Sequence, residues 1–457
     1  MTLSSSIPVA VGPAPHRVLI LGGGFAGVMT AQALEKRLGS RSDVEIWLVS
    51  RDNFMLFTPL LPEVTSGSLE PRHVVTPLRG MVRHASTWCI TADVEKIDTA
   101  ARVVTVMGGD GDAHRLQYDT LVLALGGVSY SFGIPGLDEH AVGMKSLADA
   151  FSLRNRAIEM LERADLEEDP ASRRAELTFL VGGGGFSGVE TAGELEDFVR
   201  KVRRRYYPKI ADEDLRFYLV ERDPELLREV TPRMGRWARQ QLTRRGYDVR
   251  VKTSLREVRE DAAVIGDGEV IPTRTVVWAG GVRPAPVVSE AGIEVDHGGR
   301  VKARGTMETS RPEVFAIGDC AVIENVDAAT KPFAPTAQNA VREAKVLADN
   351  IVARIDSGRL RPFRYRPIGT LASIGGYSGV GRVFGVQVRG LLAWFMWRGY
   401  YWSRVPGVNR KVRVAIDWLL TFLFGTDSVQ LKVEDVHSAL GSSGRRRPPV
   451  RDEVTSG

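Results

Sequence analysis

Cysteine is scarce in this chain of 457 residues, and the two that are present, Cys89 and Cys320, stand far apart. They form no C-x-x-C pair, which argues against a disulfide scaffold, a structural zinc site and a redox-active disulfide. Disulfide-reductase and sulfide-oxidising chemistries need paired cysteines, so both are disfavoured. No metal site is predicted.

Long apolar segments are also missing. No run of about 18 apolar residues occurs, so no transmembrane helix is predicted. The first 15 residues have neither a charged start nor an apolar core, which disfavours a secretory signal. We expect 1–15 and 438–457 to be disordered tails. Acidic residues are missing from 357–416, where 11 Lys or Arg occur without one Asp or Glu.

Glycine, by contrast, is arranged in a meaningful pattern. The apolar run 18–21 predicts a buried strand, and Gly22, Gly24 and Gly27 follow it in the G-x-G-x-x-G spacing. These glycines allow a tight turn, a close approach of the backbone to a pyrophosphate, and close packing of the next helix, expected over 28–38. The helix N-terminus then favours phosphate.

The same spacing recurs at Gly183, Gly185 and Gly188, after the predicted strand 177–181. Two such turns one domain length apart indicate two nucleotide cofactors and an α/β fold with two Rossmann-like domains. The alternative is one real site and one chance run of glycine. It is disfavoured because both copies lie between a strand and a helix.

The ends of the next strands usually carry the residue that contacts an adenosine ribose. In the first unit this place holds Ser50-Arg51-Asp52. Two interpretations are open: a displaced Asp52 binds the ribose, or Ser50 supplies the hydrogen bond. In the second unit the strand ends at Glu221, whose carboxylate would repel a 2′-phosphate, so NADH is favoured over NADPH.

Two further segments are candidates for the flavin site. The apolar segment 53–79 contains four prolines and is expected to be a rigid extended loop, which either lines a flavin ring or covers the core. Asp319 follows a predicted strand, where its carboxylate would accept hydrogen bonds from ribityl hydroxyls or cap a helix.

The basic C-terminal stretch is rich in aromatic residues. Cationic flanks around aromatic and aliphatic faces favour helices that lie in the interface of an anionic membrane. The residues expected to contact lipid are Trp394, Trp397, Trp402, Trp418 and Phe422. The alternative is packing of an ordinary amphipathic helix on the core or a partner chain. A nucleic-acid surface is disfavoured, because the aromatics lie among aliphatic residues.

Taken together, these motifs resemble the type II NADH dehydrogenases, the single-subunit flavoproteins that pass electrons from NADH to quinone without pumping protons. The matching segments occur in the family's order over 22–27, 53–64, 121–137, 182–195, 277–282, 315–321, 335–340 and 397–424.

The resemblance implies roles for particular positions. Together with the strand-end residues, the FAD site would comprise Gly22, Gly24, Gly27, Ser50, Arg51, Thr58, Pro59 and Asp319, and the NADH site Gly183, Gly185, Gly188 and Glu221. Glu190 matches a glutamate near nicotinamide and flavin, and it would orient the nicotinamide or relay a proton. From the residues alone, Glu190 could instead complement the helix dipole. Gln338 matches the first glutamine of the A-Q-x-A-x-Q quinone motif, and Arg342 stands where the second is expected.

The expected fold is α/β, with two Rossmann-like domains of the glutathione-reductase type and a C-terminal amphipathic membrane-anchoring region. The predicted parts are an FAD domain at 16–140 and 283–355, an NAD domain at 141–282, and the membrane-surface region at 356–437. The resemblance implies a homodimer, peripheral at the cytoplasmic face of the cell membrane. The alternative functions are reduction of a soluble ferredoxin-like carrier, which Arg342 keeps open, and a redox-gated interaction module.

Overall fold

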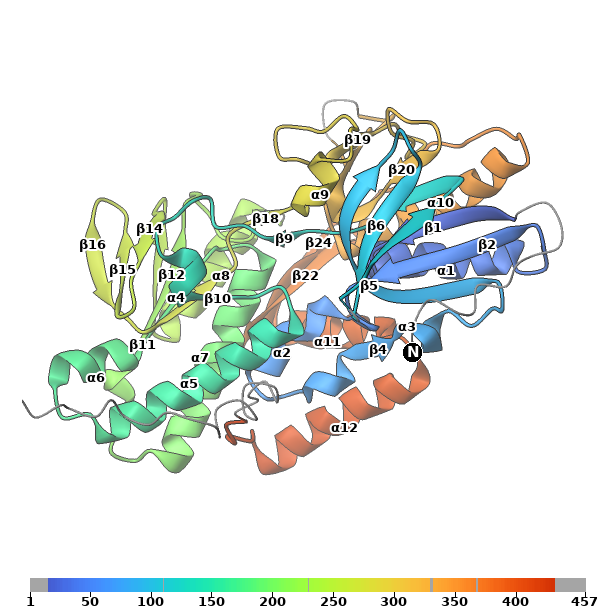
Figure 1. The fold of residues 1–457 in the computed structure, drawn as a ribbon. Helices are drawn as coiled ribbons and strands as arrows, with labels where there is room; N and C mark the ends of the chain where they lie inside the picture. The colour runs from blue at the N-terminus through green and yellow to red at the C-terminus, as the bar shows by residue number, and fades with distance from the viewer. Residues whose placement is uncertain (1–14, 110, 229, 329–331, 367–368, 432–457) are drawn as a thin grey trace, which may run out of the picture.

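The structure is a computed structural model, and it describes residues 15–431 except 110, 229, 329–331 and 367–368. Apart from Pro15, both predicted tails lie outside the described residues. The molecule has two α/β units side by side and a third, C-terminal unit that lies against both (Figure 1).

The first unit is built on a seven-stranded sheet in the order β20-β8-β1-β2-β5-β6-β7. Neighbouring strands are parallel from β20 to β5 and antiparallel from β5 to β7. The strands are β1 (His16–Leu21), β2 (Val44–Ser50), β5 (Thr87–Asp98), β6 (Val103–Gly108), β7 (Ala113–Gln117), β8 (Thr120–Leu123) and β20 (Val314–Ala316). Helices α1 (Phe25–Leu38) and α10 (Ala337–Ile355) pack against each other beside this sheet.

The second unit has a fully parallel sheet in the order β10-β17-β11-β12-β13. Its strands are β10 (Ala141–Gly143), β11 (Thr178–Gly182), β12 (Arg216–Glu221), β13 (Tyr247–Val251) and β17 (Thr275–Trp278). Its helices are α5 (Leu147–Leu166), α6 (Pro170–Glu176), α7 (Phe186–Tyr206) and α8 (Pro232–Arg244). All five residues of β11 are buried, as expected of a central parallel strand.

The chain passes between the two units twice. It leaves the first unit through β9 (Val128–Ser129) and returns through β18 (Val282–Arg283), and these two strands pair antiparallel. The predicted boundaries at 140 and 283 stay predictions.

The remaining elements of these units are α3 (Leu78–Met81), α4 (Leu137–His140), β14 (Leu255–Val258), β15 (Ala262–Ile265), β16 (Glu269–Pro272), α9 (Pro286–Ser289), β19 (Val301–Ala303), β21 (Ala321–Ile323) and the short 3-10 helices η3 (Asp212–Asp214) and η4 (Gly318–Cys320).

The segment 53–79 is more ordered than an extended loop, so this prediction is wrong. It contains β3 (Phe54–Leu56), η1 (Thr58–Leu60), α2 (Leu61–Thr65), η2 (Pro71–His73) and β4 (Val75–Pro77), and it ends in α3. The prolines are compatible with these turns because three of them stand in the first positions of η1, α2 and η2, where a backbone N–H has no helical partner.

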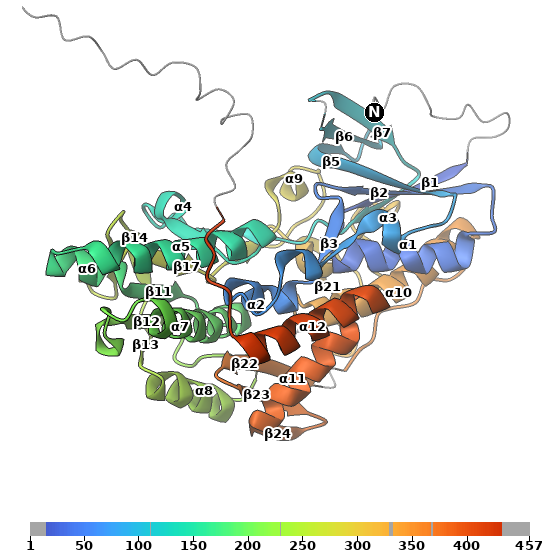
Figure 2. The same cartoon turned by 90° about the horizontal axis from the view of Figure 1, so that it is seen from below.

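The C-terminal unit is an antiparallel sheet followed by two helices. Strands β22 (Gly369–Gly375), β23 (Ser378–Val383) and β24 (Val386–Gly390) pair in sequence order. Helix α11 (Leu391–Arg404) covers this sheet, whose first strand lies against α7 of the second unit. Helix α12 (Val408–Phe424) runs beside α11 along the underside of the molecule (Figure 2).

Candidate functional site

The two glycine turns have the same geometry. Gly22 and Gly183 open them with φ of +117° and +114°, in the region that favours glycine. A Cβ on Gly27 would lie 1.9 Å from the carbonyl oxygen of Gly22, and a Cβ on Gly188 would lie 1.8 Å from that of Gly183. Both helices therefore pack on their turns at a distance that only glycine allows.

The middle glycine of each turn faces open space. Gly24 and Gly185 are the N-caps of α1 and α7, and a Cβ on either one would meet no atom within 4 Å. Neither helix has a capping side chain or an acidic residue in its first turn. The first N–H groups are thus left for a ligand, and each turn fits the pyrophosphate of a dinucleotide.

The strand-end residues occupy equivalent places in the two units. Ser50 and Glu221 each follow the last paired residue of the second strand, as the parallel registers of β1 with β2 and of β11 with β12 show. Glu221 accepts hydrogen bonds from the Gly184 and Asp223 N–H groups, the latter at 2.8 Å. Ser50 is buried under the first turn, whereas its neighbour Arg51 is exposed.

The residues predicted to contact flavin lie on short helical turns. Thr58 and Pro59 begin η1, and Asp319 lies in η4 with its Oδ2 3.5 Å from Lys145 Nζ of the second unit. The Gly318 N–H donates to Glu343 Oε2 on α10 at 2.9 Å. Burial raises the pKa of Glu343 to about 7.

Glu343 and Lys145 are members of this site that sequence reasoning missed. Lys145 lies 174 positions from Asp319 in the chain and Glu343 lies 25 positions from Gly318, and no motif marks either one. Cys320 is fully buried, and burial raises the pKa of its thiol, so it serves as a packing residue.

Glu190 lies where α7 meets the C-terminal unit. Its Oε1 accepts a hydrogen bond from the Ser373 N–H of β22 at 3.1 Å and another from the Trp397 indole N–H of α11 at 2.8 Å. The carboxyl is buried, and burial raises its pKa to about 8 against the effect of these two donors. A buried carboxyl that holds its proton at neutral pH can serve in proton transfer.

Gln338 and Arg342 lie on the first two turns of α10. The Gln338 side-chain amide donates to the Tyr400 hydroxyl of α11 at 3.4 Å. Arg342 donates to the Gln338 carbonyl at 2.7 Å, and its guanidinium lies 4.2 Å from the ring centre of Tyr365. The arginine is therefore held against an aromatic ring of its own chain.

Two family models match consecutive parts of this chain. The model of the pyridine nucleotide-disulphide oxidoreductase family matches residues 16–344, and that of the NDH2 C-terminal domain matches 368–427. The chain is 33% identical over 455 residues to an internal alternative NAD(P)H-ubiquinone oxidoreductase A1, mitochondrial, of Arabidopsis thaliana, covering 92% of this chain and 86% of that protein.

It is also 30% identical over 441 residues to the type II NADH:quinone oxidoreductase Ndh of Mycobacterium tuberculosis, covering 94% and 92% of the two chains. The chain belongs to the type II NADH:quinone oxidoreductases. The solved NDH2 of Plasmodium falciparum, in complex with RYL-552, shares the fold with a TM-score of 0.83 at 19% identity, over 91% of this chain and all of that one. The predicted family and fold class are confirmed, and FAD, NADH and quinone oxidoreduction are the cofactors and activity of this family.

The type II enzyme has two further buried carboxyls beside Glu190. Glu194, one turn later in α7, accepts from the Ser66 hydroxyl at 2.6 Å, and burial raises its pKa to about 7. Glu63 on α2 accepts from the Trp418 indole at 2.7 Å and lies 3.3 Å from Arg398 Nη2. Burial also raises the pKa of Glu63. The only hint of these groups in the sequence is the four-residue spacing that places Glu190 and Glu194 on one helix face.

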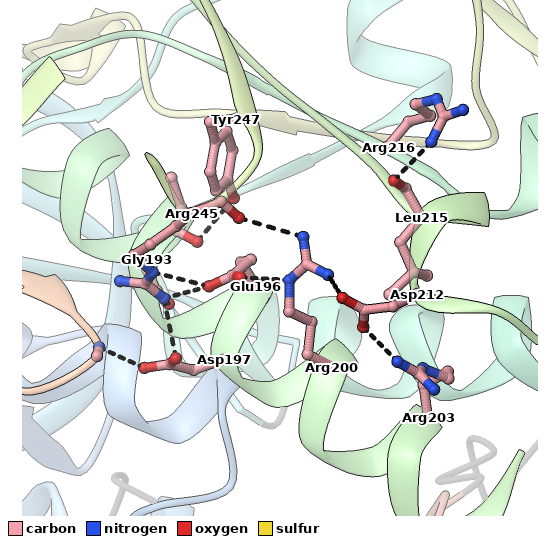
Figure 3. A network of polar contacts seen from close by, with 12 residues as sticks. Gly193, Glu196, Asp197, Arg200, Arg203, Asp212, Leu215, Arg216, Arg245 and Tyr247 are labelled. Atoms are coloured by element: carbon pink, nitrogen blue, oxygen red, sulfur yellow. Dashed lines mark hydrogen bonds and ion pairs between the residues drawn. The ribbon is translucent and has the colours of Figure 1, made fainter. Parts of the chain in front are cut away.

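A polar network fixes α7 to the C-terminal sheet (Figure 3). Arg245, just beyond α8, donates to Glu196 and Asp197 of α7 and to the Ile374 carbonyl of β22. Asp197 in turn accepts from the Gly376 N–H at 2.6 Å. These contacts hold β22 beside the helix that carries Glu190.

Two of the predicted lipid contacts are wrong. Trp394 and Trp397 are 8% and 1% exposed, because they lie on the face of α11 that packs on the β-sheet. Trp418 is partly buried and is held by Glu63. Trp402 and Phe422 are 39% and 74% exposed. The sequence predicted helices with aromatic and aliphatic faces, but α11 is apolar on both faces, so the pattern could not separate the buried face from the exposed one.

The exposed apolar side chains of the type II enzyme concentrate on α11 and α12. We call them the apolar rim: Leu391, Leu392, Phe395, Trp402, Val408, Val412, Ile416, Leu419, Leu420, Phe422, Leu423 and Phe424. Among the residues that the structure describes, no helix has the length and apolar character needed to cross a membrane.

Proposed function

We propose that this chain takes hydride from NADH onto FAD and passes the electrons to a quinone dissolved in an anionic membrane, to which it binds from the cytoplasmic face through α11 and α12. The observation that carries the proposal is the pair of matched glycine turns, each with an uncapped helix N-terminus, in a chain of this family. The predicted homodimer stays part of the proposal.

In this proposal Gly22, Gly24 and Gly27 hold the FAD pyrophosphate, and the equivalent turn at 183–188 holds that of NADH. Bound FAD supplies a ring that accepts hydride from NADH and releases electrons to the acceptor. The Glu221 carboxylate binds an adenosine ribose. Thr58, Pro59 and Asp319 border the flavin.

Quinone reduction consumes protons as well as electrons. Glu190 supplies one proton, because its buried carboxyl keeps its proton near neutral pH. It lies on α7, the helix that follows the NADH turn, at the contact with the C-terminal unit. Gln338 and Arg342 border the acceptor, with the Arg342 guanidinium fixed on Tyr365. The stacked guanidinium restricts the head groups that fit there.

The apolar rim supports contact with lipid. Its side chains belong to two adjoining helices on one side of the molecule (Figure 2). Arg404 and Arg413 are exposed on the same helices, and 357–416 contains no acidic residue. An apolar face with cationic flanks suits a helix that lies in the headgroup region of an anionic bilayer.

Anaerobic stopped-flow absorbance on the purified yellow protein tests the electron path. NADH should bleach the flavin band, and a short-chain quinone mixed in afterwards should restore it rapidly. Bleaching without recovery would leave the flavin and NADH assignments intact but would overturn the quinone as acceptor, and a soluble ferredoxin-like carrier would be tried next.

A further inference from the structure

The carboxyl of Glu190 is held from outside its own domain. Both of its described hydrogen bonds come from the C-terminal unit, one from the Ser373 N–H and one from the Trp397 indole N–H. Both end on Oε1. Among the described residues, no hydrogen bond to the other oxygen, Oε2, accompanies them, so Oε2 is the oxygen left to carry the proton of the neutral carboxyl.

Trp397 is fixed so that its N–H keeps this direction. The side chain is 1% exposed, and its ring packs edge to face on Tyr401 with the ring centres 5.1 Å apart. On the other face of α11, Phe395 and Trp402 are exposed. One helix thus presents a fixed donor to Glu190 and apolar side chains to the outside.

The charges around Glu190 make this donor important. Glu194 on α7 and Glu63 on α2 disfavour a negative charge on Glu190. Tyr401 on α11 also lies near Glu190. Arg398 is a nearby cation, but it binds Glu63. Ser66 donates to Glu194. The two N–H groups on Oε1 are the contacts that stabilise the charged form of Glu190 directly.

We infer that Trp397 is a positioning residue for the proposed proton transfer: its indole N–H holds Glu190 Oε1 and so fixes the orientation of the carboxyl. Helix α11 is then part of the active site as well as part of the membrane surface. The inference rests on the proposed function of Glu190. It predicts that loss of one N–H, with an aromatic ring kept, changes how Glu190 titrates.

The test compares Trp397→Phe with Trp402→Phe. The control lies on the same helix and also loses an indole N–H, but that group donates to the Lys411 carbonyl of α12, away from Glu190. Infrared spectra of the oxidised holoenzyme are recorded against pH, and Glu190→Gln identifies the Glu190 carboxyl band. In the wild type the band should titrate near pH 8. In Trp397→Phe the midpoint should rise by about one to two pH units, and in Trp402→Phe it should stay unchanged.

The rate of flavin reoxidation by a short-chain quinone, measured against pH, should show the same shift of midpoint in Trp397→Phe. Equal midpoints in the wild type and Trp397→Phe would overturn the inference. The infrared titration needs no turnover, so it decides the role of Trp397 independently of quinone reduction. A wild type that fails to reduce quinone would refute the proposed function instead.

A measurement on the unaltered side chain guards against misfolding of the variant. In wild-type protein with 15N-labelled tryptophan, the Trp397 indole N–H resonance should shift with the Glu190 midpoint, and it should lose this pH dependence in Glu190→Gln. The Trp402 resonance is the internal reference. A Trp397 resonance that does not respond to pH between 6 and about 9, where Glu190 titrates, would refute the hydrogen bond.

Discussion

At the scale of single residues, the glycine turns show most directly how sequence determines chemistry. At Gly27 a side chain would collide with the Gly22 carbonyl oxygen. At Gly24 a side chain would meet no protein atom, but it would occupy the open space that a ligand needs. Gly27 lets the helix approach the turn, and Gly24 leaves space for a phosphate. One motif therefore contains two different physical constraints.

Gly27→Ala should weaken FAD binding by about tenfold to a hundredfold. Its new Cβ would lie 1.9 Å from the Gly22 carbonyl oxygen, so the backbone of the turn must move. The ratio of flavin to protein after purification, and titration of the apoprotein with FAD, measure the effect. Gly80→Ala is the control, because a Cβ there meets no atom within 4 Å. Full FAD occupancy in Gly27→Ala would contradict the role of this turn.

Glu343 gives a prediction about stability against pH. Burial raises its folded-state pKa from 4.5 to about 7. The favourable contribution of Glu343 to the free energy of unfolding is therefore complete below pH 4.5 and is lost as the pH rises through 7. Glu343→Gln stays neutral and can still accept the Gly318 N–H. The free energy of unfolding of Glu343→Gln, relative to that of the wild type, should therefore increase from pH 5 to pH 8 by up to about 3 kcal/mol. The difference in melting temperature should increase with it.

Thermal unfolding of both holoproteins at several pH values measures this difference. Glu176→Gln serves as the matched control, because Glu176 is also buried but is paired with Arg163 in the second unit. A difference between Glu343→Gln and wild type that is constant with pH would show that Glu343 is not the buried titrating group described here.

At the scale of elements, local patterns predicted what local contacts decide. The turns at 22–27 and 183–188 could be placed because strand, glycine spacing and helix follow one another in the chain. The segment 53–79 was misjudged, because proline excludes the interior of a helix but suits its first turn.

Contacts between distant elements could not be predicted in this way. Lys145 reaches Asp319 across 174 positions of sequence, and Trp397 reaches Glu190 across 207. Nothing in the local spacing specifies such pairs. The faces of α11 were misassigned for the same reason: which of two apolar faces is buried depends on the sheet β22-β23-β24, against which the helix packs.

At the scale of the whole molecule, the C-terminal unit connects the site with the surface. Strand β22 is fixed to α7 by the Arg245 network, and α11 supplies the indole that holds Glu190. Helix α12 is fixed to the segment 53–79: Asp417 of α12 accepts from the Glu70 N–H and binds His73 at 2.6 Å. The apolar rim therefore belongs to a rigid part of the catalytic body rather than to a separate appendage.

This arrangement separates membrane binding from catalysis in a single experiment. Leu419→Glu combined with Leu423→Glu places two carboxylates on the exposed face of α12, where the wild-type side chains are 55% and 59% exposed, so folding should be preserved. Binding to anionic liposomes should fall at least about tenfold, because apolar burial is lost and repulsion from the lipid is added. Turnover of NADH with a water-soluble quinone should stay within about twofold of wild type, since both positions lie outside the site.

Flotation with anionic liposomes measures the binding, and Leu166→Glu is the matched control, because Leu166 is 79% exposed on α5 outside the apolar rim. Wild-type binding should also weaken as salt is added, because the cationic flanks act through screened charges. Equal flotation of the double variant and the wild type would remove α12 from the membrane surface. Loss of turnover with the soluble quinone, at unchanged melting temperature, would instead show that α12 acts on the site itself, as α11 does through Trp397.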